Sequence, residues 1–327
     1  MEVLLKTKIN EWKTSRGLEP YSDKTIANYI SQIRKLAPEN YTDMEWAKDT
    51  DAIAEKLSGF KPTTQRNYYN SLLVGLYASG MEKSSALTQH YETKRDLLNA
   101  KYQQMVGHNT ENQQAILNKV NKDVIQDMLN KMKKLMEREE GIARQDYMAY
   151  VMINVYKHYQ FRNDIAQMEV FFNKTFDEIL QEERDNTNYL VLGKPPESMS
   201  FVLNNYKTKK KYGEKVIEIK EEELKNILRE WIAFKINNKW ELIEEKVIYL
   251  FDWATGTPLN RNDISHLLSR TFQKYLGFSV STTLLRKIYG ELPDDANTAS
   301  EEEIKKVVHQ ASVSGHSVQM KGAVYAK

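Results

Sequence analysis

The chain contains no cysteine, which excludes disulfide bonds, thiolate nucleophiles and cysteine-based zinc sites. It also lacks a long apolar run. The longest stretch without a charged residue, Asn67 to Met81, is too short and too polar to span a bilayer. The first residues, Met1 to Lys8, lack the apolar core of a signal peptide. These absences predict a soluble, intracellular protein with no membrane partner.

Neither sign of charge dominates the chain, which has 47 Lys and Arg against 45 Asp and Glu. An anionic partner must therefore be met by a local basic surface. One segment, from Asn205 to Gly213, concentrates such charge in Lys207, Lys209, Lys210 and Lys211. Such a patch is typical either of a turn kept in solution by charge or of a contact with a nucleic-acid backbone.

The first hundred residues predict a small helical domain. Ser22 is a suitable cap for a helix to Leu36, and a second helix follows Pro62 and ends at Gly80. Trp12 and Trp46 are expected to complete the core of this domain. At 327 residues and 41% hydrophobic content, the chain is long enough for a second domain.

The rest of the chain alternates helices with short strands. Apolar spacing predicts helices at 124–135, 147–156, 221–234, 242–253, 263–276, 282–289 and 300–309, and strands at 188–193, 200–206 and 215–219. The polar segment around Gly107 predicts a linker. We therefore expect domains at 1–103 and 117–327, a linker at 104–116, and a mainly α fold with a small antiparallel β-sheet.

The last residues suggest chemistry, because Tyr325 follows His316 of a Gly-His-Ser by nine positions. A phenol near a histidine can attack a phosphate. The pair is weak evidence alone, since the chain has 19 tyrosines. His266 and Tyr275 show the same spacing within an amphipathic stretch that reads as an ordinary helix. Tyr325 therefore depends on support from other residues.

Metal-free attack on a phosphodiester needs a nucleophile, cations for the non-bridging oxygens and an acid for the leaving oxygen. Arginine suits the second role because its planar fork binds two phosphate oxygens. Arg162 follows an apolar helix, and Arg286 lies among apolar residues. Either one alone is more often paired with a structural carboxylate, and a lysine-rich turn is often no more than a charged surface.

Taken in order, Arg162, Lys207, Arg286, His316 and Tyr325 resemble the tyrosine recombinase, or phage-type integrase, family. Its pattern is an arginine after a helix, a hairpin lysine often written Lys-Thr, His-x-x-Arg, Gly-His-Ser, and a tyrosine nine residues past that histidine. The family is similar in fold to the type IB topoisomerases. The resemblance implies a helical core-binding (SAM-like) DNA-binding domain at 1–103 and a catalytic domain at 117–327.

The segments around Arg162 and Lys207 look most like those of integrases from large DNA viruses and eukaryotic mobile elements. The resemblance then implies integration of a viral or mobile genome, in the cytoplasm or the host nucleus. The implied activity is site-specific recombination of double-stranded DNA through a 3′-phosphotyrosyl intermediate, by a homotetramer on DNA and without ATP, cofactor or metal.

The resemblance also implies a role for each residue. Tyr325 would be the nucleophile, Lys207 would protonate the leaving oxygen, and the non-bridging oxygens would be stabilised by Arg162, Arg286 and His316. DNA phosphates near the site would be contacted by Lys209, Lys210 and Lys211. Phosphate contacts in the first domain are expected at helix starts, from Lys24, Lys61 and Arg66.

Three departures from the pattern leave alternatives open. Thr283 stands where the family has the histidine of His-x-x-Arg, and Asp164 is the only carboxylate near Arg162. Only Ala326 and Lys327 follow Tyr325, so either the sequence is truncated or assembly uses other contacts. A type IB-like DNA topoisomerase, or a DNA-binding relative with weakened catalysis, are the alternatives.

Overall fold

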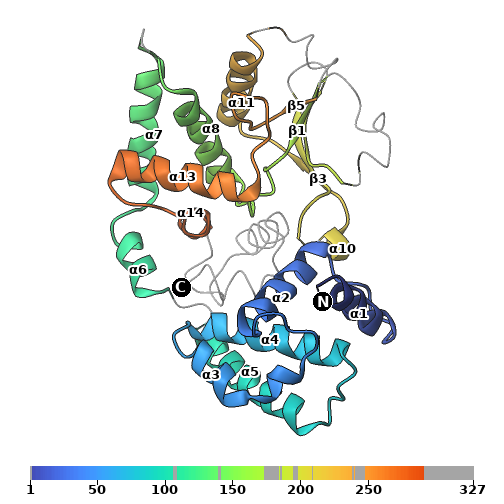
Figure 1. Cartoon of the computed structure of the whole chain (residues 1–327). Coiled ribbons are helices and arrows are strands. Elements are labelled where there is room, and N and C mark those ends of the chain that lie inside the picture. Colours follow the sequence, from blue (N-terminus) through green and yellow to red (C-terminus); the bar gives the residue numbers. More distant parts are fainter. Residues whose placement is uncertain are drawn as a thin grey trace, which may run out of the picture. The chain divides into compact units, whose positions relative to one another are not determined.

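The computed structural model describes residues 2–105, 109–138, 141–172, 184, 186–193, 198–207, 209–237, 239 and 247–290. The chain divides into two compact units, Met1–Val106 and Gly107–Lys327. Figure 1 shows the helices and strands of both units.

The first unit is helical throughout its regular structure. Its elements are α1 (Glu2–Thr14), α2 (Asp23–Leu36), the 3-10 helix η1 (Glu45–Lys48), α3 (Thr50–Leu57), α4 (Pro62–Ala78) and α5 (Ala86–Met105). The Ser22 hydroxyl accepts a hydrogen bond from the Thr25 amide and so caps α2, while Pro62 opens α4 at a position where no amide donor is needed. The two helices expected in this region are therefore present.

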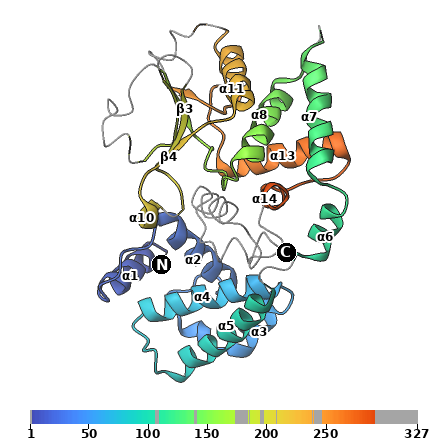
Figure 2. The ribbon, with the colours of Figure 1, turned by 180° about the vertical axis from the view of Figure 1, so that it is seen from behind.

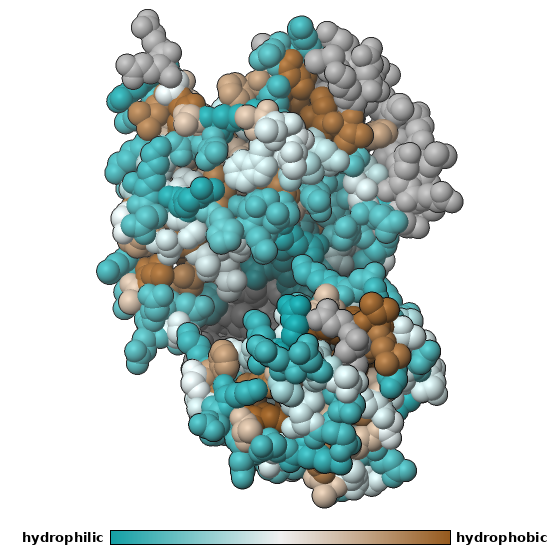
Figure 3. All heavy atoms as spheres, in the orientation of Figure 1, coloured by the Kyte–Doolittle hydropathy of each residue, from teal (hydrophilic) through white to brown (hydrophobic). Residues whose placement is uncertain are grey.

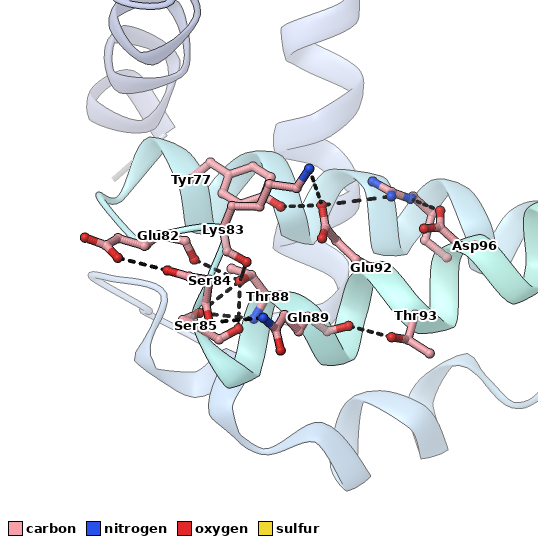
Figure 4. A network of polar contacts seen from close by, with 11 residues as sticks. Tyr77, Glu82, Lys83, Ser84, Ser85, Thr88, Gln89, Glu92, Thr93 and Asp96 are labelled. Atoms are coloured by element: carbon pink, nitrogen blue, oxygen red, sulfur yellow. Dashed lines mark hydrogen bonds and ion pairs between the residues drawn. The ribbon is translucent and has the colours of Figure 1, made fainter.

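Helix α4 forms the centre of this unit, because α1, α2 and α5 all pack against it. Trp12 stacks on Tyr77 with 5.5 Å between ring centroids. The Tyr77 hydroxyl donates to Glu92 on α5 at 2.8 Å, and Glu92 also pairs with Lys83 at 3.9 Å (Figure 4). Tyr91 is fully buried, and its hydroxyl donates to the Ala47 carbonyl at 2.6 Å.

In the second unit, helices surround a buried one. The helices are α6 (Glu111–Leu117), α7 (Lys122–Met136), α8 (Arg144–His158), α10 (Lys209–Tyr212), α11 (Glu222–Lys235), α13 (Arg261–Leu276) and α14 (Thr282–Tyr289). Every residue of α8 from Met148 to Tyr156 is buried, as expected of a helix enclosed on all sides. Helices α7, α11, α13 and α14 pack on it, and α11 lies between α8 and the sheet (Figures 1 and 2).

The sheet of the second unit has five strands in the order β4-β3-β2-β1-β5. These are β1 (Glu169–Phe172), β2 (Tyr189–Leu192), β3 (Met199–Leu203), β4 (Lys215–Glu218) and β5 (Ile248–Tyr249). The predicted mainly α fold with a small sheet is confirmed. Strands β1 and β2 run parallel whereas the other neighbours are antiparallel, so the sheet is mixed rather than purely antiparallel.

The helix predicted at 242–253 is wrong in its described part. Ile248 and Tyr249 form β5 beside β1, and Asp252 forms an isolated bridge with Pro258. Leu250 and Phe251 are consecutive and both fully buried, so their apolar character reflects burial of a turn beside the sheet rather than a helical face. The segment 104–116, expected as a linker, contains the end of α5 and all but the last residue of α6. The helix expected at 300–309 lies outside the described residues.

Hydrophilic residues cover most of the face shown in Figure 3. None of the helices in the described part of the chain is long and apolar enough to cross a membrane. Within the same residues, no group of three or more His, Cys, Asp or Glu side chains is arranged to hold a metal ion.

The buried hydroxyl of Tyr91 gives a test of the first unit. Tyr91→Phe leaves the buried Ala47 carbonyl without its donor, at a cost of about 1–2 kcal/mol. Amide exchange in α4 and α5, measured by mass spectrometry on the full chain, should become about 5- to 30-fold faster. Tyr68→Phe is the control, because the Tyr68 hydroxyl makes no hydrogen bond to any described residue. Equal exchange in both variants would contradict the prediction.

Candidate active site

The loop that carries Arg162 connects α8 to β1, and Asn163 fixes it in place. Asn163 has a left-handed backbone, φ 61°, and is 7% exposed. Its side-chain oxygen accepts a hydrogen bond from the buried Tyr156 hydroxyl on α8. Its amide nitrogen donates to the Arg261 carbonyl at 2.9 Å and to the Ser265 hydroxyl at 2.8 Å, both on α13. Arg162 therefore projects from a loop that is bound to two helices.

Asp164 is the carboxylate of this loop, and it is only 7% exposed. One oxygen accepts from the backbone amide of Arg162 at 3.3 Å, and the other accepts from the Arg261 guanidinium at 3.1 Å. Burial raises the pKa of Asp164 above its usual value, and the charges of Arg261, Arg162 and Arg286 oppose that rise. Asp164 thus orders the backbone at Arg162 and lies within electrostatic range of three guanidinium groups.

Asn188, which precedes β2, connects this loop to the β3–β4 hairpin. It is 4% exposed, and its side-chain amide donates to the carbonyls of Asp164 at 2.7 Å and Asn205 at 3.0 Å. Its side-chain oxygen accepts from the backbone amides of Asn204 at 2.8 Å and Asn205 at 2.7 Å. Arg261 also donates to the Asn205 carbonyl, at 3.0 Å. One buried side chain therefore holds the Arg162 loop and the hairpin together.

Arg286 comes from α14, which begins at a Ser281 cap and ends where the Gly290 amide donates to the Arg286 carbonyl at 2.8 Å. The Gln160 side chain donates to the Tyr289 carbonyl at 3.4 Å and joins α14 to the Arg162 loop. Burial raises the pKa of Tyr156, and the charge of Arg286 opposes this. Arg162 and Arg286, which are 124 positions apart in the sequence, therefore both act electrostatically on the same carboxylate, that of Asp164.

Two lysines lie at the β3–β4 hairpin, one in its turn and one at the start of β4. Lys207, the predicted site lysine, is exposed in the turn after β3. The turn is closed by a hydrogen bond of 2.6 Å from the Tyr206 hydroxyl to the Gly213 carbonyl. Lys215, the first residue of β4, is partly buried. Burial lowers the pKa of Lys215, the charge of Asp164 opposes this, and the charge of Arg162 adds to the lowering.

The other cations expected at the DNA lie in different surroundings. Lys209 and Lys210 lie on the one-turn helix α10, which also contains Lys211, whose side chain lies outside the described residues. In the first unit Lys24 and Lys61 are exposed at the starts of α2 and α4. Arg66 instead packs over the Tyr102 ring, 4.3 Å from its centroid, and donates to Asn99 at 3.2 Å.

His316 and Tyr325 lie outside the described residues, so their roles stay predictions. The second pair with the same spacing, His266 and Tyr275, lies on α13 as expected. Nine residues on an α-helix correspond to two and a half turns, so these two side chains face opposite sides. The Tyr275 hydroxyl contacts Asp146 at 3.3 Å. Thr283 is partly buried on α14, one turn before Arg286.

Three residues of the site were not predicted from the sequence: Asn188, Arg261 and Lys215. Each had a weak local signal. Asn188 precedes a strand, Arg261 follows the Asn260 cap of α13, and Lys215 begins a strand. None of these positions indicates a partner, because the contacts join segments far apart in the sequence.

Asn188→Ala tests whether this side chain organises the site. The substitution leaves buried backbone groups of Asp164, Asn204 and Asn205 without partners, and we expect a loss of about 2–4 kcal/mol. Calorimetry on the full chain should show the transition of the larger unit lowered by about 5–10 °C. Asn262→Ala, at an exposed position on α13, is the control. Similar melting of both variants would argue against the role of Asn188.

No protein-family model and no curated protein matches the chain. Among solved structures, the chain is similar to the Tn1549 transposon integrase in complex with transposon right end DNA. The TM-score is 0.54 and the identity 14%, over 99% of this chain and 95% of that chain. XerA recombinase also matches, at 12% identity over 99% of this chain and 92% of that chain, but its TM-score of 0.37 is too low to support an argument. The likeness to the integrase confirms, at the level of fold, the resemblance expected from the sequence: the chain has the fold of a tyrosine recombinase.

Proposed function

We propose that this protein is a site-specific DNA recombinase that cleaves and rejoins DNA through a 3′-phosphotyrosyl intermediate. The observation that carries the proposal is that Arg162 and Arg286, from separate elements, both act electrostatically on the buried Asp164. Two guanidinium groups from separate elements suit the two non-bridging oxygens of one phosphate. The integrase-like fold adds support, because that integrase was solved with transposon end DNA.

In this mechanism Tyr325 attacks the scissile phosphate and releases a 5′-hydroxyl. Arg162, Arg286 and His316 stabilise the charge that builds up on the non-bridging oxygens. A hairpin lysine protonates the leaving oxygen, and the family pattern designates Lys207. A free phenol has a pKa of about 10, so cations near it must favour the phenolate. The phosphotyrosyl bond conserves the energy of the cleaved bond for rejoining.

The buried carboxylate of Asp164 helps to fix the positions of the arginines. Asp164 bonds to the Arg162 backbone amide and to the Arg261 guanidinium. These contacts order the loop through its main chain, and the loop positions the Arg162 side chain. The charges of Arg162 and Arg286 both act on Asp164, and in the proposed mechanism both would also act on an incoming phosphate.

The proposed partner is double-stranded DNA, bound by a homotetramer. Lys209, Lys210 and Lys211 of the turn would contact phosphates near the cleaved bond. In the first unit, the exposed Lys24 and Lys61 would contact DNA phosphates as well. Such contacts would make binding weaken steeply with salt. An origin in a virus or mobile element belongs to this proposal as well.

Thr283 motivates a second candidate, a DNA-binding relative with weakened catalysis. Threonine can donate a hydrogen bond but cannot exchange a proton near neutral pH as histidine does. A topoisomerase with the same chemistry is a further outcome that the assays distinguish. Strand exchange between two duplexes supports recombination, whereas relaxation of supercoiled plasmid without exchange supports the topoisomerase.

The decisive test is a covalent protein–DNA adduct. The full chain is incubated with duplexes from the DNA that flanks its gene, denatured, and digested with protease so that the bound phosphate is mapped. Tyr325→Phe should abolish the adduct, because no phenol oxygen remains. Tyr275→Phe is the matched control and should form the adduct at the wild-type level. Absence of any adduct at all salt concentrations would refute the cleavage mechanism.

The two arginines give a separate prediction. Arg162→Lys and Arg286→Lys each retain a charge but lose the planar fork, so single-turnover cleavage of the mapped site should slow by about 10²–10³-fold. Arg270→Lys, at an exposed position on α13, should cleave at the wild-type rate. Wild-type rates for both site variants would show that the arginines are structural.

A further inference from the structure

We propose that Lys215, rather than Lys207, donates the proton to the leaving 5′ oxygen. This inference rests on the proposed cleavage reaction and assigns one of its roles to a different residue. It is carried by the position of Lys215 on β4, by the rings that its ammonium faces, and by its electrostatic contact with the Arg162 loop.

The strand places Lys215 on the inner face of the hairpin. Side chains alternate along a strand, so Lys215 and Ile217 share one face, and Val216 lies on the other. Ile217 is 7% exposed and Val216 is 60% exposed, which identifies the face of Lys215 as the covered one. Lys215 pairs with Leu203, whose side chain is 1% exposed. The register of β3 and β4 therefore directs this lysine inward, whereas Lys207 is exposed in the turn.

Two tyrosines of the turn enclose the Lys215 ammonium. Its Nζ atom lies 4.8 Å from the Tyr206 ring centroid and 5.2 Å from the Tyr212 ring centroid. Tyr206 follows Asn205, whose carbonyl is held by Arg261 and Asn188. These contacts fix a cation at the edge of the site, where aromatic rings favour its charge.

The electrostatic surroundings suit a proton donor. Burial lowers the pKa of Lys215, with the charge of Asp164 acting against this and that of Arg162 acting with it. A lysine with a lowered pKa gives up its proton more readily, and general acids work best when their pKa approaches the working pH. The same two interactions place Lys215 within range of Arg162, the proposed ligand of the scissile phosphate.

The step balances without any further reactant. The Tyr325 oxygen forms a bond to phosphorus and releases its proton to solvent, while the bond from phosphorus to the 5′ oxygen breaks. The electron pair of that bond stays on the 5′ oxygen, which takes a proton from the Lys215 Nζ. Rejoining runs in reverse, so the neutral lysine recovers its proton from the attacking 5′-hydroxyl.

The test replaces the leaving oxygen by sulfur at the mapped phosphate. A thiolate needs no proton to leave, since a thiol has a pKa of about 8.5. Lys215→Ala should slow cleavage of the oxygen substrate by at least about 100-fold, and cleavage of the sulfur substrate should return to within a few-fold of wild type. Lys215→Arg should behave in the same way, because arginine keeps the charge but does not release its proton.

Lys220→Ala, at an exposed position, is the matched control, and we expect it to leave cleavage of both substrates unchanged. Lys207→Ala tests the competing donor, and we expect it to change cleavage of the two substrates by the same factor, without rescue by sulfur. Rescue by sulfur of Lys207→Ala alone would assign the proton to Lys207 and overturn the inference. An equal loss on both substrates in Lys215→Ala would make Lys215 a positioning residue. If the wild-type chain forms an adduct but Lys215→Ala cleaves normally, the inference fails and the proposed function stands.

Discussion

The site depends on one buried polar connection, that between Asn188, the Arg162 loop and the hairpin. Asn188 satisfies backbone groups of both segments, and almost none of it is exposed to water. A buried polar group without a partner is costly, so such a connection forms as a whole or not at all. The position of Arg162 relative to the hairpin is therefore set when the second unit folds and does not depend on bound DNA.

A second consequence is electrostatic. Asp164 interacts electrostatically with Arg162, Arg261 and Arg286. Burial still raises the pKa of Asp164 despite these positive charges. The elements that carry these arginines are tied together, because Asn163 donates to the Arg261 carbonyl and Gln160 donates to the Tyr289 carbonyl of α14. Cations held in place in this way would need little reorganisation to stabilise a phosphate.

The sequence predicted those elements whose signals are local. Apolar spacing predicts the helix that is α14, and the lysine turn separates two predicted strands, so Arg286 and Lys207 could be placed on their elements in advance. Contacts across long separations could not be predicted, such as the pair of Asp164 with Arg261, 97 positions apart. Strand β5 was missed for a related reason: a two-residue strand is defined by its pairing with β1 and carries no period of its own.

The hairpin shows how register can carry function. A shift of one residue between β3 and β4 would turn Lys215 to the outer face and Val216 to the inner one. The bond from Tyr206 to Gly213 closes the turn, and Asn188 binds the chain just after β3, so both contacts hold the register at the turn end of the hairpin. For phosphate contacts, the lysines of the turn need only lie near DNA. The side chain of Lys215, in contrast, is directed to one face of the hairpin. A proton donor requires such a direction, because transfer occurs over a single hydrogen-bond distance.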